Sequence, residues 1–285
     1  MPQRLPPASK PPPPLPAATL EELAARSPIL LCLDYDGTIS ELVSRPARAR
    51  PVEGVVPALK ALAARRERIA VAIVSGRPVA QLRRMTGLGH QVMYVGVHGA
   101  EIAGRSRAAS GDDVHDNNHS SNNDDVHVPD DVARYAPELD RVRAWLARNV
   151  PDGAGFEVED KRLALALHYR HAEAAAAAAL SGKFEEFVRT DAPHLRVAHN
   201  KMVLEALPAA ASKGAAVRAL GLKAGPAFMP VYFGDDCTDE DAFAELVSRG
   251  VGVLVGEARP SLARWRVESP AAVARILTAL ATALA

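Results

Sequence analysis

The chain has 285 residues, with 34 basic and 34 acidic side chains, so its formal net charge is zero. This balance argues against binding to nucleic acid or to an acidic membrane surface. Two cysteines, Cys32 and Cys237, are too few for a disulfide framework, and we expect a cytoplasmic protein with no secretory signal and no membrane span.

The first half of the chain alternates apolar runs with amphipathic segments. Residues 1–26 are rich in proline and are expected to form a disordered tail. We then predict strands in 27–34, 69–77 and 91–102, and helices in 57–68 and 78–85. Because these strands are apolar on both faces, they indicate a parallel sheet that is covered by helices on both sides.

The pattern changes after the third strand. Residues 104–131 are polar and of low complexity, and we expect a flexible loop. Residues 132–208 predict two helices and four strands, which together form an α+β insert. The α/β pattern then resumes, so the predicted fold class is α/β. A doubly wound core of residues 27–103 and 209–285 carries an inserted cap of residues 132–208.

Polar side chains gather where the predicted strands of the core end. In open parallel sheets, ligands bind outside these carboxyl ends. Two clusters of aspartates are prominent there, one in the sequence LDYDGT and one in GDDCTDED. The candidate site residues of the core are Asp34, Asp36, Ser75, Gly76, Arg77, His98, Lys213, Asp235 and Asp239.

This set of residue types fits phosphoryl transfer. Paired buried carboxylates are costly unless a cation offsets them, and hard oxygen ligands suit Mg²⁺. One aspartate can attack phosphorus as a nucleophile, and a second, two residues on, can act as acid and base. Lys213, Ser75 and backbone N–H groups can bind the phosphoryl oxygens.

Four segments of the chain resemble a known superfamily. DYDGT, SGR, a lysine at a helix start and GDDCTDED, in this order, are similar to the four motifs of the haloacid dehalogenase superfamily of phosphatases. More narrowly, GVHGAE, VEDK followed by HYR, NKMVLEALP and SKG resemble the trehalose-6-phosphate phosphatase family. The resemblance covers roughly residues 27–280 and implies a Rossmann-like core with a cap.

The resemblance implies roles for individual residues. Asp34 corresponds to the nucleophile and Asp36 to the acid/base, while Ser75 and Lys213 correspond to phosphate ligands. Asp34, the carbonyl of Asp36 and Asp235 would hold Mg²⁺, with Asp239 in support. Gly76, Arg77 and His98 are grouped with the substrate-binding residues. In the cap, the positions that read the sugar fall on Glu159, Lys161, Arg170 and Glu205.

The activity implied by the resemblance is Mg²⁺-dependent hydrolysis of trehalose 6-phosphate through an aspartyl-phosphate. It also suggests a trehalose-6-phosphate synthase as a pathway partner. Two alternatives stay open at this point: a related capped phosphatase for sucrose phosphate or mannosyl-3-phosphoglycerate, and a sugar-phosphate sensor without catalysis. Simpler interpretations also exist, since Asp236, Glu240 and Asp241 can serve only to favour the first turn of a helix. Glu159 and Lys161 can be the solvated face of a strand.

Overall fold

The computed structural model of the chain describes residues 10–26, 28–43, 45–104, 126–200 and 202–285. They divide into two compact units, one with the residues up to His127 and from Ser212 onward, and one from Val128 to Ala211. We call the first the core unit and the second the cap unit. Within the described ranges, no helix has both the length and the apolar character needed to cross a membrane.

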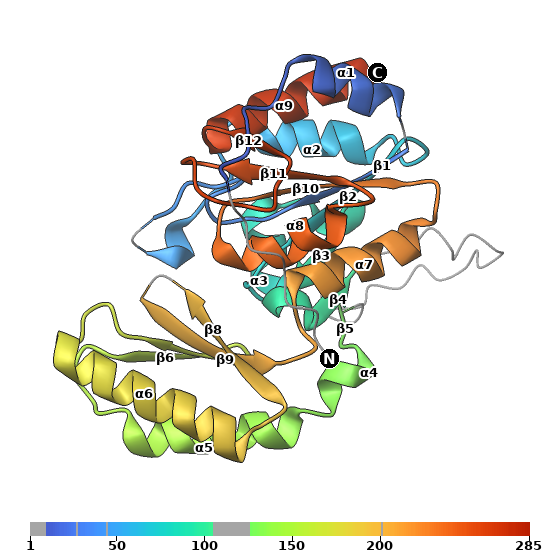
Figure 1. Cartoon of the computed structure of the whole chain (residues 1–285). Coiled ribbons are helices and arrows are strands. Elements are labelled where there is room, and N and C mark those ends of the chain that lie inside the picture. Colours follow the sequence, from blue (N-terminus) through green and yellow to red (C-terminus); the bar gives the residue numbers. More distant parts are fainter. Residues whose placement is uncertain (1–9, 27, 44, 105–125, 201) are drawn as a thin grey trace. The chain divides into compact units, whose positions relative to one another are not determined.

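The core unit is built on one eight-stranded sheet. The strand order is β12–β11–β10–β1–β2–β3–β4–β5, and neighbouring strands from β12 to β3 are parallel, whereas β4 and β5 are antiparallel additions (Figure 1). The strands are β1 (Ile29–Leu33), β2 (Ile69–Val74), β3 (Met93–Gly96), β4 (Glu101–Ala103), β5 (Val126–His127), β10 (Met229–Gly234), β11 (Val251–Val255) and β12 (Trp265–Val267).

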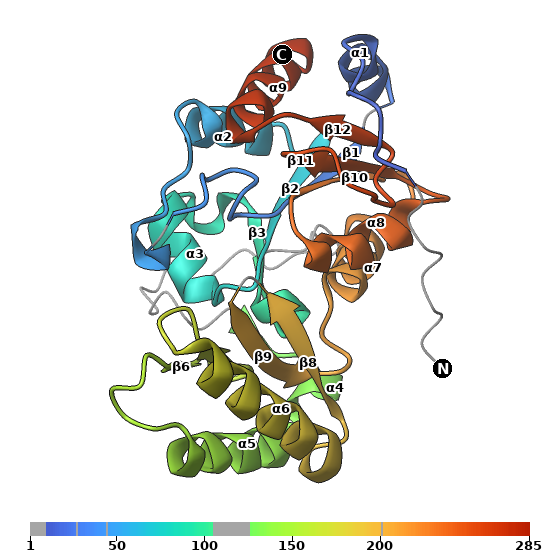
Figure 2. The same cartoon turned by 60° about the vertical axis from the view of Figure 1, so that its left-hand side comes forward.

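Helices cover both faces of this sheet. On one face, α1, α2, α3 and α9 enclose the larger apolar cluster, and α1 packs beside α9 (Figures 1 and 2). On the other face, α7 and α8 pack over a second cluster that includes Cys32 and Tyr232. The helices are α1 (Ala18–Ala25), α2 (Val55–Ala63), α3 (Val79–Thr86), α7 (Lys213–Ala224), α8 (Glu240–Leu246) and α9 (Pro270–Ala283).

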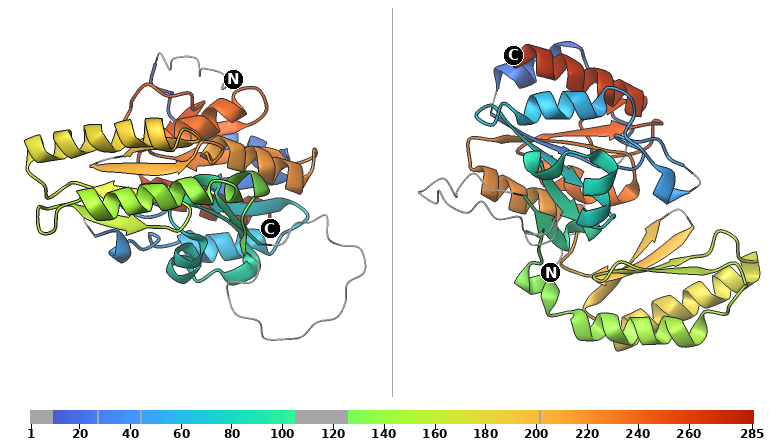
Figure 3. Two further views of the ribbon diagram at one scale, coloured as in Figure 1. Left: turned by 90° about the horizontal axis from the view of Figure 1, so that it is seen from below. Right: turned by 180° about the vertical axis from the view of Figure 1, so that it is seen from behind.

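The cap unit has a four-stranded antiparallel sheet in the order β6–β7–β9–β8. Its two long helices lie on the same face of that sheet and bury Leu165, Leu167 and Phe184 between helices and strands (Figure 3). The elements are α4 (Asp130–Ala133), α5 (Ala136–Asn149), β6 (Glu157–Asp160), β7 (Leu165–His168), α6 (Ala174–Asp191), β8 (Leu195–Asn200) and β9 (Val203–Pro208).

Two details differ from the sequence-based expectation, and a third lies outside the described residues. Residues 91–102 form two antiparallel strands instead of one, because the chain reverses through Val97 and His98, which both adopt positive φ. The predicted disordered tail was wrong for residues 10–25. Leu15 donates its N–H to the carbonyl of Arg266 in β12, and α1 follows. Most of the predicted flexible loop, residues 105–125, lies outside the described residues.

Candidate active site

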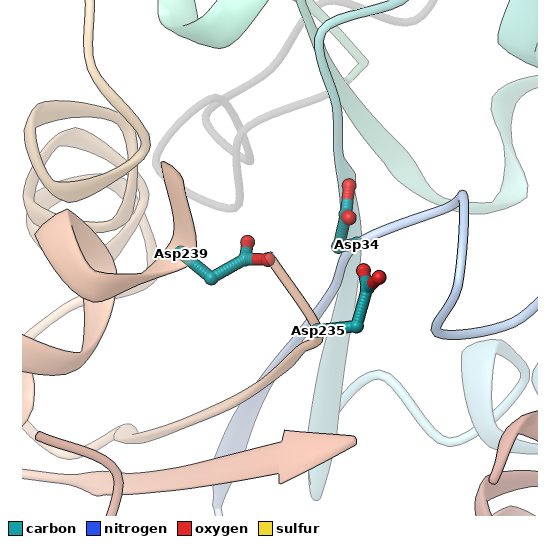
Figure 4. A group of neighbouring side chains, drawn as sticks. All are labelled: Asp34, Asp235 and Asp239. Atoms are coloured by element: carbon teal, nitrogen blue, oxygen red, sulfur yellow. The ribbon is translucent and has the colours of Figure 1, made fainter. Parts of the chain in front are cut away.

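Three aspartates converge at the carboxyl ends of the central strands. Asp34 follows β1 and Asp235 follows the neighbouring strand β10, while Asp239 belongs to the short 3-10 turn Cys237–Asp239. One carboxylate oxygen from each lies within 4.8 Å of the others, and their side chains point into the same space (Figure 4). The sheet topology therefore brings together residues that are about 200 positions apart in the sequence, as the strand-end argument predicts.

Lys213 supplies the positive charge of this cluster. It is the first residue of α7, where the Ser212 side chain caps the helix by accepting a hydrogen bond from Ala215 N at 3.0 Å. The Lys213 ammonium is buried and lies 3.1 Å from Asp34 Oδ1 and 2.7 Å from Asp239 Oδ1. The lysine thus bridges two of the three carboxylates.

Tyr232 is a site residue that the sequence analysis missed. It lies on β10, is fully buried, and donates its hydroxyl to Asp239 Oδ1 at 2.6 Å. The other oxygen of Asp239 accepts the N–H of Asp236 at 2.9 Å. Asp239 is therefore fixed by three donors. A tyrosine inside an otherwise apolar strand needs a hydrogen-bond partner when it is buried, and that signal could have identified it.

Asp36 is held by Arg77. The Arg77 guanidinium donates to both carboxylate oxygens of Asp36 at 2.6 Å, and it also donates to the carbonyl of Pro46 at 3.0 Å. The same guanidinium lies over the ring of Tyr35, 5.5 Å from its centroid. Arg77 thus binds Asp36, the predicted acid/base, whereas the sequence analysis grouped Arg77 with the substrate-binding residues.

The segment that follows β2 packs against His98. It contains Ser75 and Gly76. Ser75 is buried, its Oγ accepts the N–H of Arg77 at 3.2 Å, and its carbonyl accepts the N–H of His98 at 3.0 Å. His98 has φ of 55°, and its imidazole occupies the space beside Gly76. A Cβ on Gly76 would lie 2.5 Å from His98 Nε2, so the glycine is required for this packing.

Gly37 explains why a glycine follows the two aspartates of DYDGT. It has φ of +75°, which favours glycine, and a Cβ there would lie 2.0 Å from Asp235 Oδ2. Thr38 completes the approach, since its hydroxyl donates to Asp235 Oδ1 at 3.4 Å. The first and the last acidic motifs therefore meet through a close backbone approach that no larger residue would allow.

Charge is unevenly balanced in the cluster. Burial works against the ammonium of Lys213, but Asp239 and Asp34 outweigh burial and hold the pKa of Lys213 above its usual value. Burial, followed by repulsion from Asp239, raises the pKa of Asp235 to about 7. Burial also raises the pKa of Asp34, although Lys213 opposes this. Three carboxylates facing one lysine thus leave room for a further positive charge, and their hard oxygen donors fit Mg²⁺.

The cap unit carries a second group of predicted site residues. Glu159 of β6 and Glu205 of β9 both lie opposite Ala166 of β7, so they share one face of the cap sheet. Lys161 Nζ donates to Glu205 Oε1 at 2.9 Å. His168 forms a hydrogen bond with Glu159 at 3.1 Å, and this bond lowers the pKa of Glu159. The alternating side chains of β6, β7 and β9 thus form a charged row across a sheet.

Arg170 is the exception among the predicted cap residues. It lies in the turn after β7 with an exposed side chain. Among the residues that the structure describes, it makes no hydrogen bond or ion pair. The structure therefore places Glu159 and Glu205 on one face of the cap sheet and pairs Lys161 with Glu205, whereas Arg170 takes part in neither hydrogen-bonded pair.

Comparison with known proteins assigns the family. A model of the trehalose-phosphatase family matches residues 32–271, which is most of the chain. The chain belongs to the trehalose-phosphatase family. It is 31% identical over 260 residues to a probable trehalose-phosphate phosphatase of Oryza sativa, a match that covers 88% of this chain and 69% of that protein.

Two further matches set the limits of this family assignment. The chain is 35% identical over 271 residues to an uncharacterized glycosyl hydrolase of Mycobacterium tuberculosis, covering 91% of this chain but only 18% of that protein. This trehalose-phosphatase family member therefore spans less than a fifth of the length of one curated relative. The C-terminal domain of a Candida albicans trehalose-6-phosphate phosphatase has the same fold, with a TM-score of 0.71 and 24% identity over 96% of this chain and 99% of that one.

The fold also extends beyond trehalose phosphatases. It occurs in the C-terminal domain of a Candida albicans trehalose synthase regulatory protein, with a TM-score of 0.66 and 11% identity, over 93% of this chain and 99% of that one. It also occurs in the sucrose-phosphatase of a Synechocystis species, with a TM-score of 0.57 and 18% identity, over 89% of this chain and 98% of that one. The fold alone thus does not select the substrate of this family member, and the site residues must carry that argument.

Proposed function

We propose that the chain hydrolyses trehalose 6-phosphate to trehalose and phosphate. The observation that carries this proposal is the buried Lys213, whose ammonium joins Asp34 and Asp239 beside Asp235 at one edge of the sheet. This arrangement places a nucleophile, a positive charge and an acidic cation site together, as phosphoryl transfer requires. Family membership supports trehalose 6-phosphate as the ester.

Asp34 and Asp36 would share the chemical steps. A carboxylate oxygen of Asp34 attacks phosphorus while the bond from phosphorus to the sugar oxygen breaks, and the departing oxygen takes the proton of Asp36. The product is an aspartyl-phosphate on Asp34. In the second step a water gives its proton to Asp36 and attacks phosphorus, which returns Asp34 as a carboxylate and releases phosphate. Lys213 offsets the negative charge of the phosphoryl oxygens in both steps.

Mg²⁺ is part of the same proposal. Asp34, Asp235 and Asp239 provide the carboxylate oxygens that would hold it. Burial, followed by repulsion from Asp239, raises the pKa of Asp235, and a bound cation would offset that repulsion. When bound, Mg²⁺ would offset negative charge on the phosphoryl group. Tyr232 and Lys213 would keep Asp239 oriented, so we assign Asp239 a supporting role and Asp34 and Asp235 the main one.

The charged row of the cap sheet is our candidate for recognition of the sugar. Glu159, Lys161 and Glu205 present charged donors and acceptors on one face of the cap sheet, and such groups bind hydroxyls through charge-assisted hydrogen bonds. We include Arg170 in this proposal on the basis of the family resemblance alone.

The surroundings of the reaction are also proposals. Cys32 is buried and Cys237 exposed, and both are free thiols, which suits a reducing cytoplasm. Trehalose 6-phosphate has to be made by a glycosyl transfer, so a trehalose-6-phosphate synthase is the pathway partner that this substrate implies.

The test is phosphate release from a panel of sugar phosphates, with and without Mg²⁺. We expect trehalose 6-phosphate to be turned over orders of magnitude faster than glucose 6-phosphate or sucrose 6-phosphate, and only with the metal. Metal-dependent activity that favours another ester would keep the chemistry and refute the cap proposal. Tight binding without phosphate release would identify a sensor instead.

The cap proposal has a sharper test of its own. Glu205→Ala should raise KM for trehalose 6-phosphate by at least tenfold, because it also leaves Lys161 without its partner. The same variant should leave kcat/KM for p-nitrophenyl phosphate nearly unchanged, because this ester has no sugar to recognise. Equal losses with both substrates would show that Glu205 only supports the fold of the cap.

A further inference from the structure

Arg259 holds the loop that carries Asp235. It lies between β11 and β12, and its guanidinium donates to the carbonyl oxygens of Asp235 at 3.1 Å and Asp236 at 2.9 Å. The same group donates to Glu240 Oε1 at 2.7 Å and to the carbonyl of Pro260 at 3.3 Å. One side chain therefore joins two consecutive peptides of the acidic loop to the start of α8.

Glu240 completes this connection from the other side. Its second carboxylate oxygen accepts the N–H of Leu262 at 2.8 Å, so the glutamate bonds to both the side chain and the backbone of the 259–262 segment. Four hydrogen bonds, each involving Arg259 or Glu240, thus join the segment after β10 to the loop after β11.

The position of Asp235 depends on this fixed backbone. Its carboxylate lies against Gly37, where even a Cβ would come within 2.0 Å of Asp235 Oδ2, so the side chain has little freedom on that side. In addition, Arg259 holds the peptide carbonyls of Asp235 and Asp236. We propose that Arg259 is a positioning residue that sets the Asp235 carboxylate for binding a divalent cation.

Two effects of Arg259 on a cation have opposite signs. Its positive charge repels a cation, but the side chain is a third exposed, so solvent and salt screen that repulsion. Its hydrogen bonds fix the geometry of a ligand, and such supporting contacts commonly change metal affinity by about 10- to 100-fold. Positioning therefore outweighs repulsion, and removal of Arg259 weakens metal binding.

The inference rests on the proposed function, in which Asp235 holds Mg²⁺, and its test needs no turnover. Thermal unfolding of the full chain is followed over a Mg²⁺ titration without substrate, for the wild type, Arg259→Gln and Arg259→Lys. The matched control is Arg218→Gln, because Arg218 pairs with Glu245 of the same helix α8 away from the acidic cluster. Each variant is compared with its own metal-free unfolding temperature, which removes any general loss of stability.

We expect Arg259→Gln to need at least about tenfold more Mg²⁺ for half of the metal-induced rise in unfolding temperature. Arg259→Lys should lie closer to Gln than to the wild type, because one ammonium cannot span two carbonyls and a carboxylate as the guanidinium does. Arg218→Gln should match the wild type. If Arg259→Gln does not fold, Arg259→Lys alone decides.

An unchanged or lower Mg²⁺ requirement in the Arg259 variants would overturn the inference, as would a wild type that Mg²⁺ does not stabilise. The substrate proposal fails separately. If Mg²⁺ stabilises the wild type through Arg259 but trehalose 6-phosphate is not hydrolysed, the positioning role stands and only the proposed reaction is refuted.

Discussion

Replacement of Arg77 by glutamine should separate protonation of the leaving group by Asp36 from phosphoryl transfer to Asp34. The substitution removes both bonds to Asp36, each 2.6 Å long, and the bond to the carbonyl of Pro46. A hydrogen bond to a charged group contributes roughly 1.5–3 kcal/mol. The Asp36 side chain is 34% exposed, so water can replace part of the lost hydrogen bonding. We therefore take about 2–3 kcal/mol for the two hydrogen bonds between Arg77 and Asp36 together.

A loss of about 2–3 kcal/mol in positioning the acid corresponds to roughly 30- to 150-fold in rate. We therefore expect turnover of trehalose 6-phosphate to fall about 100-fold, because the sugar oxygen needs a proton to leave. Phosphoryl transfer from p-nitrophenyl phosphate to Asp34 should fall less than about threefold, because p-nitrophenolate leaves without one.

The assay is the pre-steady-state burst of p-nitrophenol, compared with steady-state phosphate release from trehalose 6-phosphate. The burst isolates the first step, whereas the second step uses Asp36 as a base for either substrate. Asp36→Asn should show the same split between the two rates. A burst rate for Arg77→Gln that falls as far as the turnover of the sugar ester would refute the reasoning. Arg77 would then act on the phosphoryl group itself.

Three further predictions concern the buried cluster. Asp34→Asn should abolish turnover while the circular dichroism spectrum and the cooperativity of unfolding stay those of the wild type, and normal turnover would exclude Asp34 as the nucleophile. Tyr232→Phe should lower the free energy of unfolding by about 1.5–3 kcal/mol, because it removes a donor from the charged Asp239. The control Tyr94→Phe breaks only the neutral hydrogen bond with Thr86 and should cost about 0.5–1.5 kcal/mol. Equal losses in denaturant titrations would contradict this. The third concerns pH: burial raises the pKa of Asp235 from 3.8 to about 7, so the metal-free native state keeps a proton that the unfolded chain has released, and stability should fall as pH rises from about 5 to 7. Asp235→Asn should reduce that slope, to which one proton contributes at most about 1.4 kcal/mol per pH unit. The raised pKa of Asp34 leaves a remaining slope of the same sign, and an unchanged slope in the variant would assign the whole effect to other groups.

The sequence predicted those parts of the fold that depend on continuous apolar runs. β1 and β2 are buried along nearly their whole length, and β10 is buried from Val231 to Gly234. Asp34 and Asp235 lie directly after β1 and β10, as expected. β12 was missed because it has only three residues, one of which is Arg266. A run this short has no periodicity that can be recognised.

The parts of the site that could not be predicted are contacts between side chains and distant backbone. Arg259 donates to the carbonyls of Asp235 and Asp236. Nothing in the sequence around this loop residue indicates those partners. The pairing of Arg77 with Asp36 is similar, since charge alone is equally compatible with a phosphate ligand. Motifs identify residue types at strand ends, but the choice of partner is decided by the three-dimensional packing of loops.

The proline-rich segment beside β12 has a consequence for association between molecules. An outer strand normally offers its free N–H and C=O groups to any other chain that can pair with it. Here the outer edge of β12 is taken by residues 13–15, through the carbonyl of Pro13 and the N–H of Leu15.

This segment contains four consecutive prolines, Pro11 to Pro14, which have no N–H to donate. It therefore pairs with β12 on one side but cannot donate hydrogen bonds to a further strand on its other side. The run of prolines thus acts as a built-in stop to strand addition, which protects this end of the sheet from aggregation.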